Sequence, residues 1–364
     1  MKQETPPIWK PTWNKQNFFE PIDFFARRIH YIDHIVPIWE HIPLTMRGNF
    51  YVPDNLKNYT EERTSGKVIG VKPYTSGGQS HKIVPEGEGP LLICAYADLR
   101  AAYGKNPKRP FILMEHGVGL SFPEHTPAYG GGDGYRAYVN LFLAPNTNIY
   151  TKTAKTYPNA KQVIIGTPKL DKWINYVPSP ISNPPVVAIS FHWDGKCVCP
   201  EAGNALEHYR KVLPILSKHF HVIGHGHPRI INELIPIYHK YGFEIIQDFE
   251  EVQRRVDVYV NDSSSTIYEF LVTGKPIVIL NAPWFRKSAS YGIRFWDYTD
   301  IGPQCEAPED LISCIKKGLL SGNEYAPFRE KAIKDLYPYW GTSSERAGEA
   351  IVSFVRGVQL KRVL

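Results

Sequence analysis

Short apolar runs in this chain repeatedly end on histidine, which is one of the residue types able to move protons at neutral pH. His116 follows the apolar run Phe111–Met114 and precedes a glycine. In open α/β sheets ligands bind beyond the carboxyl ends of the strands, so this position predicts an imidazole beside a substrate. An imidazole within hydrogen-bond reach of a hydroxyl group can take its proton. We therefore predict that His116 is a general base, and a structural loop histidine is the alternative.

Two further histidines, His225 and His227, follow the apolar run His221–Gly224. An imidazole N–H there could offset the negative charge that develops on a departing diphosphate or nucleotide. We predict a donor contact for His227 and place His225 in the surrounding cleft. Histidines at i and i+2 also suit a metal ion, but no third ligand lies near them in the sequence.

A serine-rich turn, Asn261–Ser265, lies between the apolar run Val256–Val260 and a helical pattern over Thr266–Thr273. Its residues are good helix N-caps, and the start of a helix offers backbone N–H groups, hydroxyl donors and the positive end of the helix dipole. Such a turn predicts a phosphate or diphosphate site. Glu269 lies about one turn further on, where a carboxylate could accept hydrogen bonds from a ribose diol. An ordinary, well-capped βαβ unit is the alternative.

Other polar residues follow the predicted strands of the second half. His192 and Trp193 come directly after the run Val186–Phe191 and are candidates for lining a cleft, with simple packing as the alternative. Arg286 and Arg294 follow the next strand after the serine-rich turn. A guanidinium can clamp a phosphate with two parallel hydrogen bonds, so both are phosphate candidates.

The glycine-rich segment Tyr129–Gly134 invites a phosphate-loop interpretation, but it lacks the Lys-Ser/Thr pair of that motif and does not closely follow a strand. We predict an acceptor-side loop in which Asp133 touches substrate. No Asp-x-Asp motif precedes a strand end in the manner of metal-dependent sugar transferases. We therefore expect no obligatory metal.

These candidates require a scaffold that brings strand ends together, and the sequence predicts one. Short apolar strands alternate with helices, which is typical of a parallel, doubly wound α/β sheet. By contrast, residues 1–90 look irregular, with a helical pattern over Asn17–Trp39 that Pro21 and Pro37 should break. Four prolines within Asn175–Pro185 predict a linker. We expect three parts: 1–178 on the acceptor side, 179–345 on the donor side and a C-terminal helix, 346–364, that crosses back to the first domain.

Composition limits the class of protein. The chain has 364 residues, enough for two domains, and its 43% hydrophobic and 21% charged residues are typical of a globular protein. Its net charge of +6 favours acidic ligands. There is no apolar run of about 18 residues and no signal-peptide pattern, so we expect a cytoplasmic protein. The five cysteines have no zinc-module spacing, and we expect reduced thiols.

The motifs together resemble the two-domain nucleotide-sugar transferases called GT-B. The resemblance is closest to bacteriophage-encoded glycosyltransferases and to the CDP-glycerol glycerophosphotransferase-like family. That family has an Asp-x-Ser-Ser turn, a helix with an acidic residue, and a Lys-Pro pair. The matching residues here are Asp262, Ser263, Ser264, Ser265, Glu269, Lys275 and Pro276.

Further matches extend the resemblance from about Phe111 to the C-terminal end. Met114-Glu115-His116-Gly117 resembles a motif of the phage enzymes, and the histidine at this point is taken as the general base in the CDP-glycerol family. His227-Pro228, Arg294-Phe295 and Gly302-Pro303 resemble later family motifs. A Ser-x-Arg segment that opens a terminal helix is matched by Ser343-Ser344-Glu345-Arg346. The resemblance is specific in the C-terminal half and looser before it.

The resemblance implies a GT-B fold, with two Rossmann-like domains facing each other across a cleft. It implies transfer of a sugar from a UDP-, GDP- or CDP-linked donor to a hydroxyl acceptor, without a metal. His116 would be the base, and donor contacts would come from His227, Asp262, Ser263, Ser264, Ser265, Glu269 and Arg294.

Several alternatives stay open. They are glycerophosphate transfer from CDP-glycerol, sugar transfer onto hydroxymethylated bases of phage DNA, a nucleotide-sugar 2-epimerase, and a nucleic-acid-binding protein with a basic surface. If the protein is phage-encoded, the host cytoplasm is its expected location. DNA or a virion protein is then a candidate acceptor.

Overall fold

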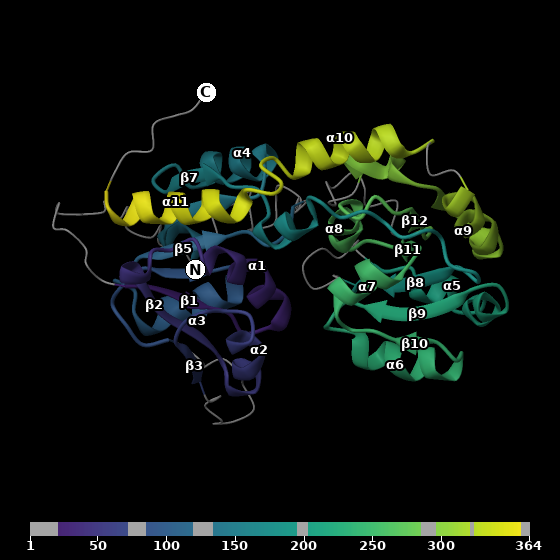
Figure 1. The fold of residues 1–364 in the computed structure, drawn as a ribbon, viewed down its shortest axis with the longest axis horizontal. Coiled ribbons are helices and arrows are strands. Elements are labelled where there is room, and N and C mark those ends of the chain that lie inside the picture. The colour runs from purple at the N-terminus through teal and green to yellow at the C-terminus, as the bar shows by residue number, and fades with distance from the viewer. Residues whose placement is uncertain are drawn as a thin grey trace, which may run out of the picture. The chain divides into compact units, whose positions relative to one another are not determined.

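The computed structural model describes residues 21–71, 85–118, 134–194, 203–284, 296–320 and 324–357. The chain divides into two compact units, each around its own parallel sheet (Figure 1). Of the described residues, the first unit comprises 21–71, 85–118, 134–171 and 337–357, and the second comprises 172–194, 203–284, 296–320 and 324–336. The predicted α/β class, with two parallel sheets and helices, is confirmed.

The sheet of the first unit has seven strands, all parallel, in the order β3-β2-β1-β4-β5-β6-β7. Successive residues of a strand point to opposite faces, and here both faces are buried. In β4, for example, Leu92 packs on one face and Leu91 and Ile93 on the other. The strands are β1 (Ile22–Phe25), β2 (Arg47–Pro53), β3 (Val68–Val71), β4 (Leu91–Ile93), β5 (Phe111–Met114), β6 (Val139–Ala144) and β7 (Lys161–Ile164).

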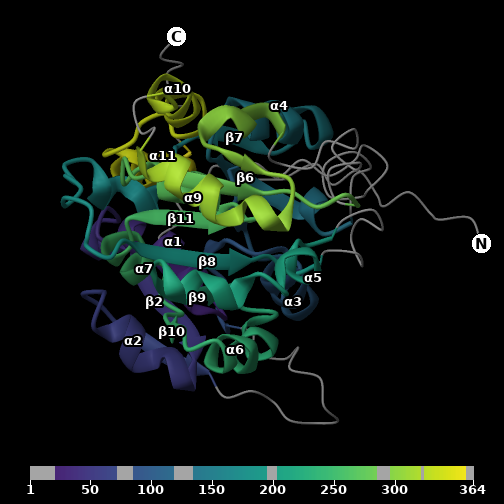
Figure 2. The same ribbon diagram turned by 90° about the vertical axis from the view of Figure 1, so that its right-hand side faces the viewer.

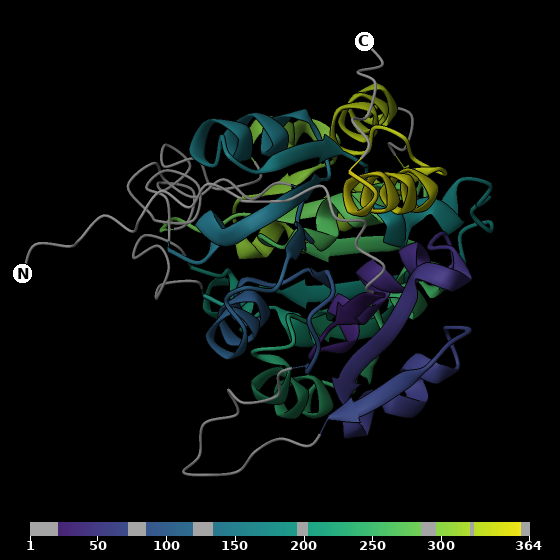
Figure 3. The same cartoon turned by 90° about the vertical axis from the view of Figure 1, so that its left-hand side faces the viewer.

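The expectation that residues 1–90 are irregular is wrong for the part that the structure describes. Three strands and two helices occur there, and their purple and indigo segments make one side of the first sheet (Figure 3). The helices are α1 (Ile29–Trp39) and α2 (Lys57–Glu61). Helix α1 continues through Pro37, which lies in its last turn, because Ile32, Ile35 and Ile38 bury one face of the helix in the core.

Three more helices complete the first unit: α3 (Tyr96–Lys105), α4 (Thr147–Thr156) and the C-terminal α11 (Ser343–Val355). Helix α11 packs against α1 and the first sheet through Ala347, Ala350 and Ile351, and it is drawn in yellow in Figure 1. Asp171 caps its start. The carboxylate accepts hydrogen bonds from the backbone N–H groups of Gly341 (3.0 Å), Ser343 (3.1 Å) and Ser344 (2.7 Å).

The sheet of the second unit has six parallel strands in the order β10-β9-β8-β11-β12-β13, and β9, β8 and β11 lie side by side in Figure 2. Its strands are β8 (Val186–Phe191), β9 (His221–Gly226), β10 (Glu244–Ile245), β11 (Val258–Asn261), β12 (Ile277–Leu280) and β13 (Gln304–Cys305). Its helices are α5 (Leu206–Tyr209), α6 (Ile231–Lys240), α7 (Phe249–Arg255), α8 (Thr266–Leu271), α9 (Leu311–Leu320) and α10 (Ala326–Leu336).

Two predicted elements differ from the structure in ways that matter for the site. The sequence of Ala205–Leu216 predicts one helix, but the structure has the single turn α5 followed by a 3-10 helix, Leu213–Lys218. Strand β9 continues two residues beyond its expected end at Gly224, so His225 lies within the strand.

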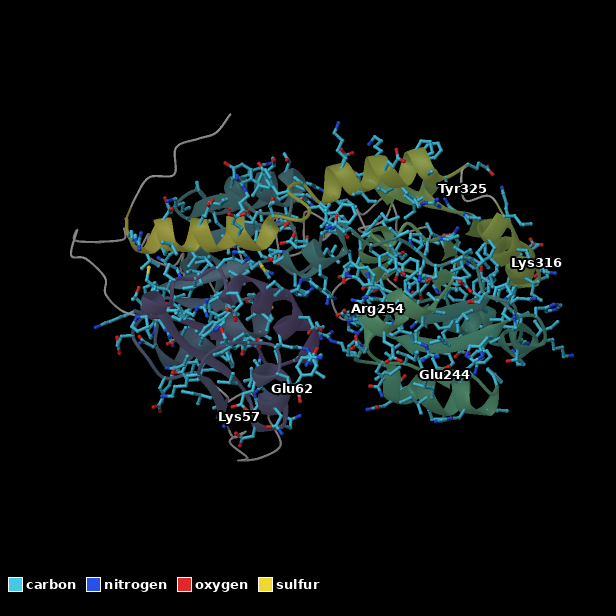
Figure 4. All side chains as sticks on the ribbon, viewed as in Figure 1. Lys57, Glu62, Glu244, Arg254, Lys316 and Tyr325 are labelled. Atoms are coloured by element: carbon cyan, nitrogen blue, oxygen red, sulfur yellow. The ribbon has the colours of Figure 1, made fainter. Side chains whose placement is uncertain are left out.

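Charged side chains are most common on the outer surface, where Figure 4 labels examples from each unit. Glu244 pairs with Arg255 (2.7 Å) and with His221 (2.9 Å) on the exposed side of β10. Within the part of the chain that the structure describes, no helix is both long and apolar enough to cross a membrane.

Candidate active site

His116 lies in the loop after β5, at the carboxyl edge of the first sheet. Its side chain is half-buried, and its Nδ1 atom lies 2.6 Å from the carbonyl oxygen of Cys94, which follows β4. Because a carbonyl oxygen can only accept a hydrogen bond, Nδ1 must carry the proton. In the neutral ring Nε2 is then the basic nitrogen, which is the arrangement that a general base needs.

The backbone around His116 is held by buried polar contacts. The Glu115 carboxylate accepts a hydrogen bond from Nε of Arg136 (3.2 Å), and both side chains are buried. The Asn146 amide donates to the carbonyl of Val118 (2.8 Å) and also caps α4. These contacts tie down the loop on both sides of the imidazole.

Helix α1 brings three more rings to His116. The ring centroids of Tyr31, His34 and His30 lie 5.0, 6.0 and 6.3 Å from that of His116. The sequence analysis missed these residues because it treated this region as irregular. The spacing of His30 and His34, four residues apart on one helical face, is the signal that could have found them.

His34 is buried, and burial lowers its pKa well below the usual value for histidine. The positive charges of Lys169, His116 and His30 lower it further. His34 is therefore a neutral imidazole at physiological pH.

In the second unit, Asp262 joins the loops that follow β8 and β11. It is buried, and its Oδ1 accepts hydrogen bonds from the backbone N–H groups of His192 (2.9 Å) and Ser263 (2.6 Å). Its Oδ2 accepts from Ala205 N–H (2.9 Å). Burial raises the pKa of Asp262 to about 6, against the lowering effect of these three donors. Both oxygens are thus engaged with backbone, which suits a positioning role better than the predicted donor contact.

The serine-rich turn differs from the predicted phosphate cradle. Ser263 N–H donates to Asp262, and Ser264 N–H donates to Oδ1 of Asn261 (2.9 Å). Ser264 Oγ in turn accepts from Thr266 N–H (3.3 Å). Two of the backbone donors expected to meet a phosphate are therefore used within the turn. Ser265 is half-exposed at the N-cap of α8, and its side chain makes no capping hydrogen bond.

Glu269 is buried on α8, one turn beyond the serines. Its backbone carbonyl accepts a hydrogen bond from the side chain of Gln253 (2.8 Å), which ties α8 to α7. The structure thus places Glu269 on the same element as the turn, and its predicted contact with a ribose stays a prediction.

His192, Trp193 and His227 form a ring cluster at the ends of β8 and β9. The centroids of His192 and His227 are 4.7 Å apart, and Trp193 lies 5.7 Å from His192 and 6.1 Å from His227. The guanidinium of Arg229 lies 4.2 Å from the Trp193 ring. The backbone N–H of Arg229 also donates to Nδ1 of His227 (3.1 Å), so Nε2 carries the proton in the neutral ring. His227 is thus a hydrogen-bond donor through Nε2.

His225 does not belong to this cluster. Its Nδ1 lies 2.9 Å from Ser190 Oγ, and its ring packs beside Phe249 (5.5 Å) and Tyr259 (6.5 Å). The side chain is buried because β9 extends beyond Gly224, and the expectation that His225 lines a cleft stays a prediction.

Three predicted residues, Asp133, Arg286 and Arg294, lie outside the residues that the structure describes. Helix α11 does begin with the Ser343-Ser344-Glu345-Arg346 segment. The Asp171 carboxylate accepts hydrogen bonds from the backbone N–H groups of the two serines. Among the described residues, no group of three or more His, Cys, Asp or Glu side chains is arranged to hold a metal ion.

Comparison with known families gives a match over the second unit and the C-terminal helix. Residues 208–353 match the family model of CDP-glycerol:poly(glycerophosphate) glycerophosphotransferases. This match confirms the resemblance inferred from Asp262, Glu269 and the Lys275-Pro276 pair. It supports an enzyme of the glycosyltransferase or glycerophosphotransferase type.

Solved structures share the fold over almost the whole chain. A variant of the wall teichoic acid polymerase TagF soaked with CDPG is 14% identical, covers 93% of this chain and 89% of its own, and has a TM-score of 0.62. The S. aureus MnaA–UDP structure is 13% identical, covers 94% of this chain and 98% of its own, and has a TM-score of 0.58. A comparison with curated protein sequences gives no match.

Proposed function

Proceeding from the family match over residues 208–353, we propose that this protein transfers a group from a nucleotide-activated donor to a hydroxyl acceptor, with His116 as the general base. The observation that carries the proposal is the 2.6 Å contact between His116 Nδ1 and the Cys94 carbonyl. It leaves Nε2 as the basic atom at the carboxyl edge of a parallel sheet.

In the reaction, Nε2 of His116 takes the proton of the acceptor hydroxyl as the acceptor oxygen forms its new bond to the donor. Nδ1 keeps its proton and donates it in a hydrogen bond to the Cys94 carbonyl, and this bond orients the ring and stabilises the imidazolium. The bond between the transferred group and the nucleotide breaks at the same time, and its electron pair leaves with the nucleotide.

The second unit supplies the donor contacts in this proposal. His227 presents Nε2–H to a phosphate oxygen, and the hydroxyl groups of the serine turn add further donors. Glu269 accepts hydrogen bonds from the ribose diol. Asp262 acts through its neighbours, because it holds the loops that carry His192 and Ser263.

Two transferred groups remain candidates, and they leave different products. The sequence analysis favours a sugar, whose transfer releases a nucleoside diphosphate. The family match favours glycerophosphate from CDP-glycerol, whose transfer breaks the diphosphate and releases a nucleoside monophosphate. The fold is also similar to that of a putative UDP-N-acetylglucosamine 2-epimerase from Listeria monocytogenes (TM-score 0.57), which keeps the 2-epimerase as another candidate. An epimerase changes the sugar nucleotide without any acceptor.

The test begins with binding. CDP-glycerol and the UDP-, GDP- and CDP-linked sugars are compared by thermal shift, since a ligand at 100 times its dissociation constant adds about 2.7 kcal/mol. The best donor is then incubated with hydroxyl acceptors, and the nucleotide released is identified as mono- or diphosphate. We expect donor-dependent release that requires acceptor. If no nucleotide-linked donor raises the melting temperature, the proposal is wrong.

The base is tested with His116→Ala beside the surface control His219→Ala. We expect His116→Ala to bind the donor normally and to lose at least about a hundredfold in rate, the usual contribution of a positioned base. The exposed His219 should tolerate the change. Loss of donor binding with an unchanged rate at saturation would instead assign His116 to the donor.

A further inference from the structure

Helix α1 lies outside the residues that match the family model, yet three of its side-chain rings lie near the imidazole of His116. The Tyr31 ring meets His116 edge to face at 64°, and the His34 ring does so at 66°. Edge-to-face contacts of this kind favour one orientation of the enclosed ring. The contacts therefore bear on how the ring is turned as well as on where it lies.

The same helix is tied to the atom that accepts the His116 proton. The thiol of Cys94 donates to the carbonyl oxygen of Tyr31 (3.4 Å), while the carbonyl of Cys94 accepts from His116 Nδ1 (2.6 Å). Cys94 thus links the backbone of α1 to the imidazole. A shift of α1 would move both the ring contacts and the acceptor of the Nδ1 proton.

We propose that Tyr31 and His34 are positioning residues for His116, which hold its ring so that Nδ1–H meets the Cys94 carbonyl and Nε2 remains the base. This inference rests on the proposed role of His116 as the base. The inference adds residues of α1 to the candidate active site, and α1 lies outside the residues that match the family model.

His34 acts in this arrangement as a neutral ring. It is buried beside Lys169, His116 and His30, so a second imidazolium at this place would be repelled by its neighbours. Its contribution is shape, and a phenyl ring of similar size should replace it. Tyr31 likewise contributes its ring face, so loss of the hydroxyl alone should be tolerated.

The experiment uses the full chain with ¹⁵N-labelled histidine, because imidazole nitrogen shifts report which nitrogen carries the proton. The His116 signal is assigned by its loss in His116→Gln. We compare Tyr31→Ala and His34→Ala with the ring-preserving Tyr31→Phe and His34→Phe. His41→Ala, an exposed position beyond the end of α1, is the control.

We expect Nδ1–H at His116 in the wild type, in both phenylalanine variants and in the control. In the two alanine variants we expect a mixture of tautomers and a loss in kcat of about tenfold or more, with KM nearly unchanged. Rescue by phenylalanine separates positioning from a need for a second titrating group.

Two results would overturn the inference: an Nε2–H tautomer in the folded wild type, or alanine variants that keep both the Nδ1–H signal and kcat. If an alanine variant does not fold, the two phenylalanine variants still test the inference. Loss of the Nδ1–H signal of His116 in a folded phenylalanine variant would contradict the positioning role of the rings. Full activity of His116→Gln would instead refute the base itself, which is a failure of the proposed function.

Discussion

At the scale of single residues, the structure shows which atoms of each candidate side chain are already bonded to the protein backbone. His116 and His227 each have one ring nitrogen tied to the protein backbone, which sets the chemistry of the other. Asp262 has both oxygens on backbone N–H groups, which ties the loops after β8 and β11 together. The same residue type therefore has a different role depending on which of its atoms the fold already uses.

Glu269 provides the residue-scale prediction. We expect Glu269→Ala to weaken nucleotide binding by more than tenfold, because a ribose diol would lose a charged acceptor. Isothermal titration with the best donor measures the affinity, and the melting temperature without ligand checks the fold. Glu251→Ala, an exposed glutamate on α7, is the matched control. Equal affinities for both variants would remove Glu269 from the site.

At the scale of elements, helices α1 and α11 depend on polar groups, one buried and one half-buried, whose energetics can be measured. Helix α1 carries the neutral His34 in the core, and the start of α11 depends on Asp171. Both groups belong to the first unit, so their effects on stability report on that unit.

The His34 prediction concerns pH. Its folded-state pKa is lowered, so below the unfolded-state value of about 6.5 the unfolded chain binds a proton that the folded chain does not. Stability should therefore fall as pH drops from 7.5 to 5.5, with a slope of up to about 1.4 kcal/mol per pH unit from this group. His34→Phe should lose less stability over the same range. Denaturant unfolding of both proteins at several pH values tests this, and parallel pH profiles would contradict it.

The Asp171 prediction concerns the helix cap. Asp171→Ala removes the acceptor for three backbone N–H groups and for Ser344 Oγ (2.6 Å), so we expect a loss of about 1–3 kcal/mol. Asp248→Ala is the matched control, because Asp248 caps α7 through a single N–H, that of Glu250 (2.8 Å). Hydrogen exchange across α11 and denaturant unfolding measure the effect. If Asp171→Ala lowers the free energy of unfolding no more than Asp248→Ala does, then the additional hydrogen bonds of Asp171 contribute little to stability.

At the scale of the whole molecule, the prediction is metal independence. The proposed donor contacts are fixed hydrogen-bond donors that need no cation. We expect full transfer activity after exhaustive EDTA treatment, once a donor and an acceptor are found. The measurement is the rate of nucleotide release before and after chelation. Abolition by EDTA and recovery with Mn²⁺ would require a carboxylate ligand that the proposal does not contain.

Much of the fold follows from local patterns in the sequence. The strands at Phe111–Met114 and Val186–Phe191 are predicted to the residue, because a short apolar run between polar turns is typical of a buried strand. The strands β1 to β3 are missed because Pro21, Pro37 and many aromatic residues obscure the pattern there. The pairing of β1 with β4 supplies stability that local propensity does not indicate.

The sequence by itself determined that polar and histidine residues follow strand ends, because alternation of strands and helices is a local property of the chain. Only the tertiary structure decided which of their atoms remain for chemistry. The proton on His116 Nδ1 depends on a carbonyl 22 residues away, and the engagement of Asp262 depends on Ala205, 57 residues away. Burial of His225 likewise depends on Ser190 and Phe249. Contacts between residues distant in sequence leave no periodic signal, so spacing alone could not reveal them.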